Sequence, residues 1–166
     1  TIGDMMPLWN ENRNIVKHGL RIINEHKYKE FDMLLDNIDE VSEMDISFKL
    51  VPKLNAIGRL QEEGDPNSDP NNIVRHYFLS KNIANKIFMK ENIININKKR
   101  QDKSKKMFND AIKMVDDNSF IIIKDKDFNE GIVGLVAGKL SNLYNKPTIV
   151  FSEKEEYKFD KVLLLD

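Results

Sequence analysis

Apolar and polar positions follow helical spacing over the first part of the chain. Between Glu11 and about Glu25, apolar residues recur near helical intervals, which predicts a helix there. A second, short helix is predicted from Tyr28 to Asn37. Ser42, with Asp45 three residues on, provides a capping pattern before the stretch VPKLNAIGRL at residues 51–60. The N-terminal part is therefore expected to be helical.

The middle of the chain is predicted to be one long helical region. Residues 72–116 contain neither Gly nor Pro and read as helix, with a break near residues 80–81. Within them, NKKRQDKSKK at residues 97–106 lacks any apolar side chain, which is typical of a helix that bridges domains or faces solvent or a ligand. The expected buried stripe of this region comprises Ile83, Ile87, Ile94, Phe108, Ala111, Ile112 and Val115.

The pattern changes from helical to strand-like near the end of the chain. FIIIKD at residues 120–125 is a short β-branched run and predicts a strand, and KPTIVFS at residues 146–152 predicts a second one. Small and apolar residues at helical spacing lie between them. A strand, a helix and a strand within so short a segment predict a βαβ unit with parallel strands, so the fold class is α/β.

Composition places the chain among globular proteins. It has 166 residues, 40% of them apolar and 32% charged, and no cysteine. Without cysteine there are no disulfides and no thiolate metal site, and no apolar run approaches the roughly 20 residues of a membrane span. A cytoplasmic location is the expectation. Because the chain begins with Thr1 inside an apolar stretch and ends in KVLLLD, we expect it to be part of a longer protein.

Charge is distributed unevenly along the chain. Residues 81–113 carry ten Lys or Arg against three Asp or Glu, a net charge of +7, whereas residues 1–80 carry −5 and residues 114–166 carry −3. A basic segment between acidic flanks is compatible with binding a polyanion. A solvated lysine-rich helix explains the same pattern equally well.

The stretch at residues 51–60 places polar residues on an apolar turn. In a helix, Asn55 and Arg59 lie four positions apart and share a face, with Lys53 nearer the helix start. Gly58 removes a side chain beside Arg59 and allows a backbone to approach. An Arg fork with an Asn amide could clamp a phosphate, or Arg59 could simply pair with a nearby carboxylate.

Two further features have both a structural and a functional interpretation. In GIVGLVAG, Gly131 and Gly134 open a helix after a strand, where they permit either close helix–sheet packing or phosphate binding. Asp4 lies among residues that would otherwise form a buried strand or strand end, so its carboxylate needs a partner or a metal, or serves as a cap. No complete catalytic site can be assembled from the sequence.

Three blocks together resemble a known family, the DHH-type phosphoesterases, and within it the exonucleases specific for single-stranded DNA. TIGDMMPLWNENRNIVKHGL (residues 1–20) resembles the end of the DHH domain, and FKLVPKLNAIGRL (residues 48–60) resembles the family's P-R-L-N-A-A-G-R-L block. FNEGIVGLVAGKLSNLYNKPTIV (residues 128–150) resembles the glycine-rich block of a DHHA1 domain, and NKKRQ (residues 97–101) matches N-x-x-R-Q on the connecting helix.

The resemblance implies a fold, an activity and a set of site residues. It implies the end of a DHH domain at residues 1–62, a loop and long connecting helix at 63–117, and part of a DHHA1-like domain at 118–166. It further implies a 5′→3′ exonuclease that uses Mn²⁺ or Mg²⁺, with single-stranded DNA as the partner. By position, Asp4 matches a metal ligand, and the residues matching nucleic-acid contacts are Lys53, Asn55, Gly58, Arg59, Arg100, Gly131 and Gly134.

Departures from the family pattern limit what this segment can do. The Asp-His-His motif and the earlier acidic motifs are absent, so this chain alone is expected not to cleave DNA. EEYKFDKVLLLD stands where the family has Gly-Ser-x-Arg, and Lys53 stands where Arg is usual. Two alternatives remain open: a phosphodiesterase acting on oligoribonucleotides or cyclic dinucleotides, and a non-catalytic nucleic-acid-binding module.

Overall fold

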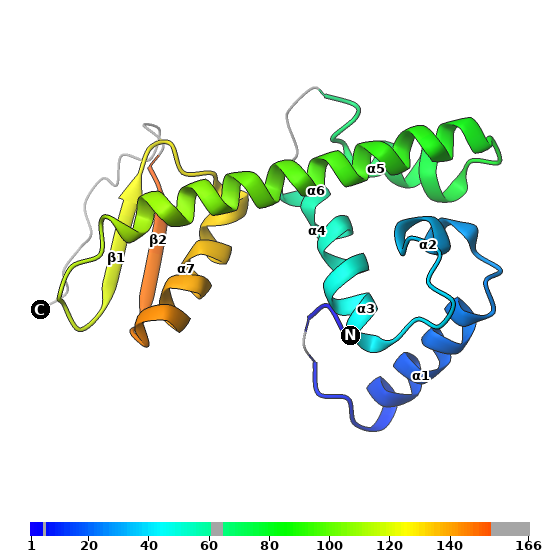
Figure 1. Ribbon diagram of the computed structural model, residues 1–166, viewed down its shortest axis with the longest axis horizontal. Coiled ribbons are helices and arrows are strands. Elements are labelled where there is room, and N and C mark those ends of the chain that lie inside the picture. Colours follow the sequence, from blue (N-terminus) through cyan, green and yellow to red (C-terminus); the bar gives the residue numbers. More distant parts are fainter. Residues whose placement is uncertain (5, 61–64, 154–166) are drawn as a thin grey trace, which may run out of the picture. The chain divides into compact units, whose positions relative to one another are not determined.

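The structure is a computed structural model, and it describes residues 1–4, 6–60 and 65–153. The chain divides between residues 100 and 101 into two compact units, which we describe one at a time. The expected boundary between residues 62 and 63 lies outside the described residues, and the expected division into three parts stays a prediction. Figure 1 follows the elements along the chain.

The first unit is helical, as the apolar spacing predicts. Its helices are α1 (Asn10–Asn24), α2 (Lys29–Leu34), α3 (Glu43–Asp45), α4 (Val51–Arg59), α5 (Pro70–Ile73) and the first part of α6 (Ile83–Ile112). The π-helical segments η1 (Ile46–Leu50) and η2 (Val74–Leu79) connect α3 to α4 and follow α5. The predicted break between two helical regions is confirmed at residues 80–82.

A capping box starts the continuous helical stretch that leads into α4. The Ser42 hydroxyl accepts the Asp45 N–H at 3.3 Å, and the Ser42 N–H donates to the Asp45 carboxylate at 3.0 Å. This is the arrangement that the Ser and Asp spacing predicts, and it satisfies two backbone donors that the helix leaves free. The capping box therefore fixes the residue at which the helical stretch α3–η1–α4 begins.

The predicted buried stripe of the long helix is wrong in its first half. Ile83 is 60% exposed and Ile87 is 51% exposed. The buried residues are instead Met89, Ile93 and Ile96, which lie about 80° to 180° away from Ile83 and Ile87 around the helix at 3.6 residues per turn. Both sets have helical spacing, so periodicity alone does not decide which one faces the core. In the second half, Ala111 is buried, as predicted.

The second unit contains the predicted βαβ unit. Strands β1 (Ile121–Asp125) and β2 (Thr148–Ser152) pair in parallel, with Ile121 opposite Thr148 and Ile123 opposite Val150. Helix α7 (Glu130–Tyr144) connects them and packs on β2, with buried side chains Ile132, Val136 and Leu140. Lys139 of α7 also lies over the Phe108 ring of α6, 5.7 Å from its centroid.

No helix in the described part of the chain is long and apolar enough to cross a membrane. Helix α6 has 30 residues, but it includes the polar stretch at residues 97–106.

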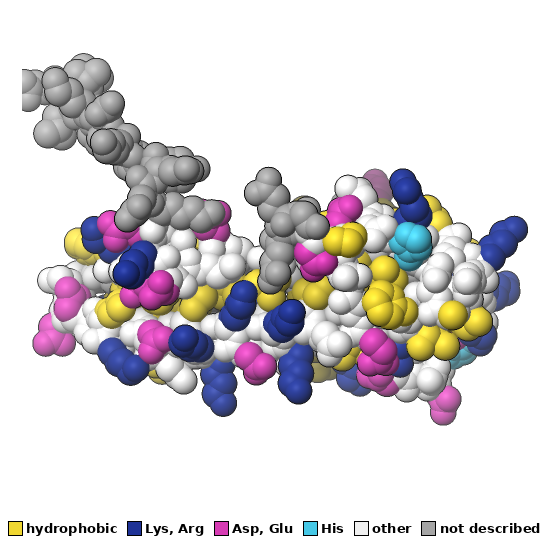
Figure 2. Space-filling model, turned by 90° about the horizontal axis from the view of Figure 1, so that it is seen from above, with side chains coloured by type: hydrophobic (Ala, Val, Ile, Leu, Met, Phe, Trp, Pro, Cys, Tyr) yellow, Lys and Arg dark blue, Asp and Glu magenta, His cyan; other side chains and the backbone are white. Residues whose placement is uncertain are grey.

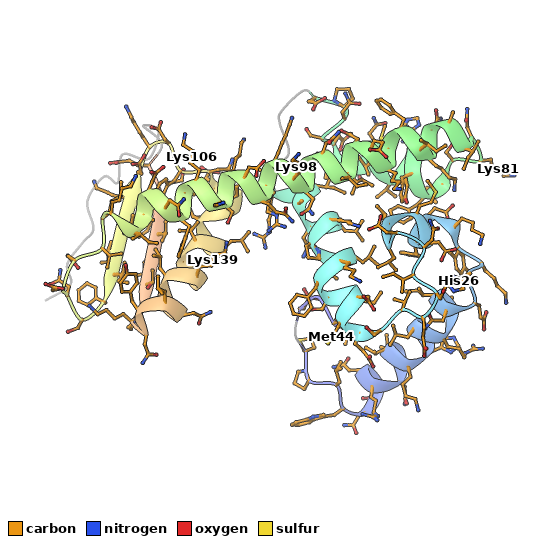
Figure 3. All side chains as sticks on the ribbon, viewed as in Figure 1. His26, Met44, Lys81, Lys98, Lys106 and Lys139 are labelled. Atoms are coloured by element: carbon orange, nitrogen blue, oxygen red, sulfur yellow. The ribbon has the colours of Figure 1, made fainter. Side chains whose placement is uncertain are left out.

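Asn24 and His26 fasten the loop after α2 to the end of α1. Figure 3 labels His26. The Asn24 amide donates to the Val41 carbonyl at 3.0 Å and accepts the Val41 N–H at 2.7 Å. His26 lies 2.8 Å from the Asp32 carboxylate through Nδ1 and 3.0 Å from the Asp39 carbonyl through Nε2. Both partners of the imidazole accept hydrogen bonds, so the ring satisfies both only as the imidazolium.

We expect the stability of the protein to fall as the pH rises, because of His26. The Asp32 hydrogen bond, and then the Asp39 carbonyl, raise the pKa of His26 above its ordinary 6.5, against the opposing effects of desolvation and of the Lys29 charge. Stabilisation by His26 is therefore complete below pH 6.5 and is lost as the pH rises through the folded-state pKa. Urea denaturation at several pH values between about 5.5 and 8.5 measures this dependence.

The partner of His26, Asp32, does not change its protonation between about pH 5.5 and 8.5 and so does not add to this pH dependence. Burial favours the neutral Asp32 carboxyl, but hydrogen bonds from His26 and Lys29 outweigh it and lower the pKa of Asp32 below its ordinary 3.8. Its contribution is lost only in acid. His26→Asn should reduce the pH dependence of the free energy of unfolding. Equal slopes for His26→Asn and the unmodified protein would contradict the assignment.

Candidate nucleic-acid interface

Helix α4 has one buried face and one face that carries the candidate polar residues. Ala56 and Ile57 are buried, whereas Asn55 and Gly58 are exposed and Arg59 is half-buried. Apart from its chain neighbours and the backbone of α4 itself, no described atom lies within 4 Å of the place where a Cβ would sit on Gly58. The helical prediction for this stretch is confirmed, and the spacing brings Asn55 and Arg59 to the same side of α4.

Two arginines from different helices lie near one another in the first unit. Arg100 of α6 is half-buried, and its Nη2 donates to the Asn97 carboxamide oxygen at 2.7 Å. Burial, and secondly the charge of Arg59, lower the pKa of the Arg100 guanidinium. The Arg100 guanidinium still stays protonated at neutral pH, because arginine loses its proton only in strong base. We call the Arg59–Arg100 pair the positive centre; because the two like charges repel each other, an anion beside both would stabilise the pair.

Lys53 points away from this positive centre. Its side chain is 14% exposed, and its ammonium donates to the Leu34 carbonyl at the end of α2. It also lies 3.5 Å from the Asp36 carboxylate. The predicted contact of Lys53 with nucleic acid is not tested by these bonds, but they give its charge a partner within the protein.

The second unit presents further basic side chains on the continuation of α6. An open groove of about 400 Å³ follows this helix and is lined by Asp102, Lys105, Lys106, Asn109, Asp110 and Lys113. Lys113 pairs with Asp110 at 3.0 Å, whereas Lys105 and Lys106 are exposed. Figure 3 labels Lys98 and Lys106 on α6. In Figure 2, basic and acidic side chains are interspersed, with no broad field of one sign on this face.

Ser104 is a feature of α6 that sequence reasoning missed. It belongs to the stretch predicted to be polar on all sides, yet it is 2% exposed. Its hydroxyl has no hydrogen-bond partner among the described residues. A small side chain between lysines is the signal that would have indicated close packing at this position.

The start of α7 is capped by its own sequence. The Asn129 carboxamide oxygen accepts the Gly131 N–H at 3.0 Å, so one of the free donors of the first turn is satisfied. Gly131 is half-buried and Gly134 is exposed. Apart from its chain neighbours and the backbone of α7 itself, no described atom lies within 4 Å of a Cβ placed on Gly134, which leaves room for the approach of a ligand. Packing and phosphate binding both remain possible functions of these glycines.

Asp4 does not lie in a buried strand, which corrects the sequence-based expectation. It is part of an exposed turn, and its side chain is 83% exposed. The described residues contain no group of three or more His, Cys, Asp or Glu side chains that could hold a metal ion. A metal site that includes Asp4 therefore requires ligands from outside the described part of the chain.

Comparison with known proteins shows which proteins the chain is related to. No family model matches the chain. The single-stranded-DNA-specific exonuclease RecJ of Bacillus subtilis is 35% identical over 164 residues, which is 94% of this chain. The chain is homologous to RecJ. The RecJ of Haemophilus influenzae is 25% identical over 169 residues, again covering 94% of the chain.

Solved RecJ structures have the same fold as the chain. Thermus thermophilus RecJ in complex with Mg²⁺ matches with a TM-score of 0.78 at 21% identity, over 92% of this chain and 24% of that one. A manganese-bound RecJ matches with a TM-score of 0.74 at 22% identity, over 92% of this chain and 38% of that one. The α/β fold class is confirmed.

The chain corresponds to only part of a RecJ. It spans 20% of the length of the Bacillus subtilis relative and 28% of the Haemophilus influenzae relative. The exonuclease activity belongs to these relatives as whole proteins, and for this chain it is a proposal.

Proposed function

We propose that the chain is a segment of a metal-dependent exonuclease that degrades single-stranded DNA in the 5′→3′ direction. The 35% identity to Bacillus subtilis RecJ over nearly the whole chain carries this proposal. The segment supplies substrate-binding residues and one metal-ligand carboxylate, Asp4. The longer protein belongs in the cytoplasm, in DNA repair and recombination.

The first DNA contact is assigned to the polar face of α4 together with Arg100. Arg59 and Arg100 hold positive charge on two neighbouring helices, which suits a backbone phosphate. Asn55 adds an amide donor on the same side of α4. Gly58 leaves space for the sugar–phosphate backbone, because no described atom would crowd even a Cβ there.

The second contact is assigned to the second unit. Lys105 and Lys106 are exposed along the groove on α6 and can neutralise phosphates without reading the base sequence. Gly131 and Gly134 allow a backbone to approach the start of α7. This arrangement fits an enzyme that acts on single strands of any sequence.

The described residues do not form a binding site for Mn²⁺ or Mg²⁺ on their own. These residues bring no three candidate ligands together, so they do not fit a metal ion on their own. The ions seen in the RecJ structures would activate water and stabilise charge in the longer protein. Within this chain, the part assigned to that site is Asp4.

Hydrolysis of end-labelled DNA tests the proposed function. We expect a chain of the relatives' full length to release mononucleotides from the 5′ end of single-stranded DNA with Mn²⁺ or Mg²⁺, and EDTA to abolish the activity. The 166-residue chain should cleave nothing. Asp4→Asn in the full-length protein should lower the rate by about 10²-fold or more, since one metal ligand is lost. Preferred cleavage of short oligoribonucleotides or cyclic dinucleotides would contradict the assignment.

A further inference from the structure

Lys53 occupies the buried side of α4, not the side that carries the proposed DNA contacts. At 3.6 residues per turn, it shares a face with Ala56, Ile57 and Leu60, all of which are buried. Asn55 follows it by two positions, about 200° around the helix. Lys53 and Asn55 therefore project from opposite sides of α4.

The partners of Lys53 lie at the C-terminal end of α2. Its ammonium donates to the Leu34 carbonyl and lies 3.5 Å from the Asp36 carboxylate. Leu34 is fully buried, and its carbonyl belongs to the last turn of α2. Carbonyls in this turn have no intrahelical partner and carry the negative end of the helix dipole, so a cation stabilises them.

The backbone that follows α2 adopts an unfavourable conformation, which neighbouring residues must stabilise. Asp36 and Asn37 both have left-handed conformations, with φ values of 57° and 55°. Consecutive non-glycine residues in this region are uncommon and persist only where their surroundings hold them. The Asn37 N–H donates to the Asp32 carbonyl at 2.8 Å, and Lys53 holds the same turn from α4.

We infer that Lys53 is a positioning residue that fastens α4 to the C-terminal turn of α2 and thereby orients Asn55 and Arg59 toward DNA. This inference rests on the proposed function for its second half only. The contact between Lys53 and the end of α2 exists in the protein without DNA. The orientation of Asn55 and Arg59 toward DNA matters only in the complex. Replacement of Lys53 therefore changes affinity through the placement of α4 and removes no phosphate contact.

Binding of a fluorescent oligo-dT at several salt concentrations separates a positioning residue from a contact. Lys53→Met keeps the aliphatic stem and loses the ammonium, and should weaken binding about fivefold or more. The slope of log K against log salt should not change, because the number of neutralised phosphates is the same. Lys53→Arg should restore affinity. The matched control is Lys49→Met, which removes an exposed lysine paired with Asp45 and should bind like the unmodified chain.

Two results would overturn the inference. A salt slope that is shallower by about 0.7 in Lys53→Met would make Lys53 a phosphate contact. Unchanged affinity in that variant would remove the positioning role.

Hydrogen exchange without DNA tests the anchoring separately from the proposed function. In Lys53→Met, the Leu35 and Asn37 amides, which donate within this turn, should exchange faster, and they should not in Lys49→Met. Unchanged protection there would exclude the anchor whether or not the chain binds DNA. Failure of the unmodified chain to bind oligo-dT, with the exchange result as expected, would count against the proposed function and the orienting role but leave the anchor in place.

Discussion

Tyr77→Ala is expected to destabilise the protein by about 3–5 kcal/mol, because it empties a fully buried aromatic site. The Tyr77 ring contacts Phe78 edge-on, with centroids 4.9 Å apart. Its hydroxyl donates to the Glu30 carbonyl at 2.6 Å. Burial, and secondly the Glu30 charge, raise the pKa of the Tyr77 phenol, so the hydroxyl stays a donor at all ordinary pH values.

Glu30, whose carbonyl accepts the Tyr77 hydrogen bond, also forms an ion pair with Lys86 of α6 through its carboxylate. The Lys86 ammonium contacts the Glu30 carboxylate, and both side chains are less than a fifth exposed. Burial opposes the charge on Glu30, but the bond from Lys86 outweighs it and lowers the pKa of the carboxyl. Tyr77 and Lys86 thus join η2 and α6 to the first turn of α2, which is why the loss of Tyr77 should affect the whole first unit.

Urea denaturation followed by circular dichroism measures the effect, and two variants serve as controls. Tyr77→Phe keeps the ring and loses only the hydroxyl, so we expect about 1–2 kcal/mol. Tyr28→Ala removes a half-exposed tyrosine and should cost about 1 kcal/mol or less. A Tyr77→Ala variant no less stable than Tyr28→Ala would contradict the buried position of Tyr77.

The second large effect is expected on DNA binding. The double variant Arg59→Ala/Arg100→Ala should weaken binding of single-stranded DNA by about 100-fold or more. A hydrogen bond to a charged group contributes about 1.5–3 kcal/mol, and each arginine is assigned one phosphate. Fluorescence anisotropy with oligo-dT at fixed salt measures the change.

Two controls separate lost contacts from lost folding or lost net charge. Lys17→Ala removes one positive charge from the exposed side of α1 and should bind almost as well as the unmodified chain. Arg59→Lys keeps the charge without the planar fork and should lie between the unmodified chain and Arg59→Ala. If the double variant and Lys17→Ala bound equally, the phosphate contacts would lie elsewhere.

Local sequence signals predicted the elements of the fold well. The Ser42–Asp45 spacing marked a capping box because its two hydrogen bonds are local. Short β-branched runs on either side of a helix marked β1 and β2, and the parallel pairing followed from the connection between them. These features depend on residues close together in the chain, so the sequence contains what decides them.

Contacts between residues far apart in the chain could not be predicted from the sequence. The rotation of α6 was predicted wrongly because Ile83 and Ile87 have the same spacing as the buried Met89 and Ile93. Nothing local indicates that Lys53 reaches Leu34, 19 residues away, or that Arg59 lies near Arg100. The candidate residues themselves came from matching blocks of sequence, and their surroundings came from the structure.

The salt dependence of binding to single-stranded DNA tests the central claim most directly. For the unmodified 166-residue chain, log K for oligo-dT should fall linearly with log salt, with a slope of about −0.7 for each phosphate neutralised. Loss of Arg59 and Arg100 should make that slope shallower by about 1.4, corresponding to two phosphates. Affinity independent of salt, or a slope unaffected by the two substitutions, would contradict the account.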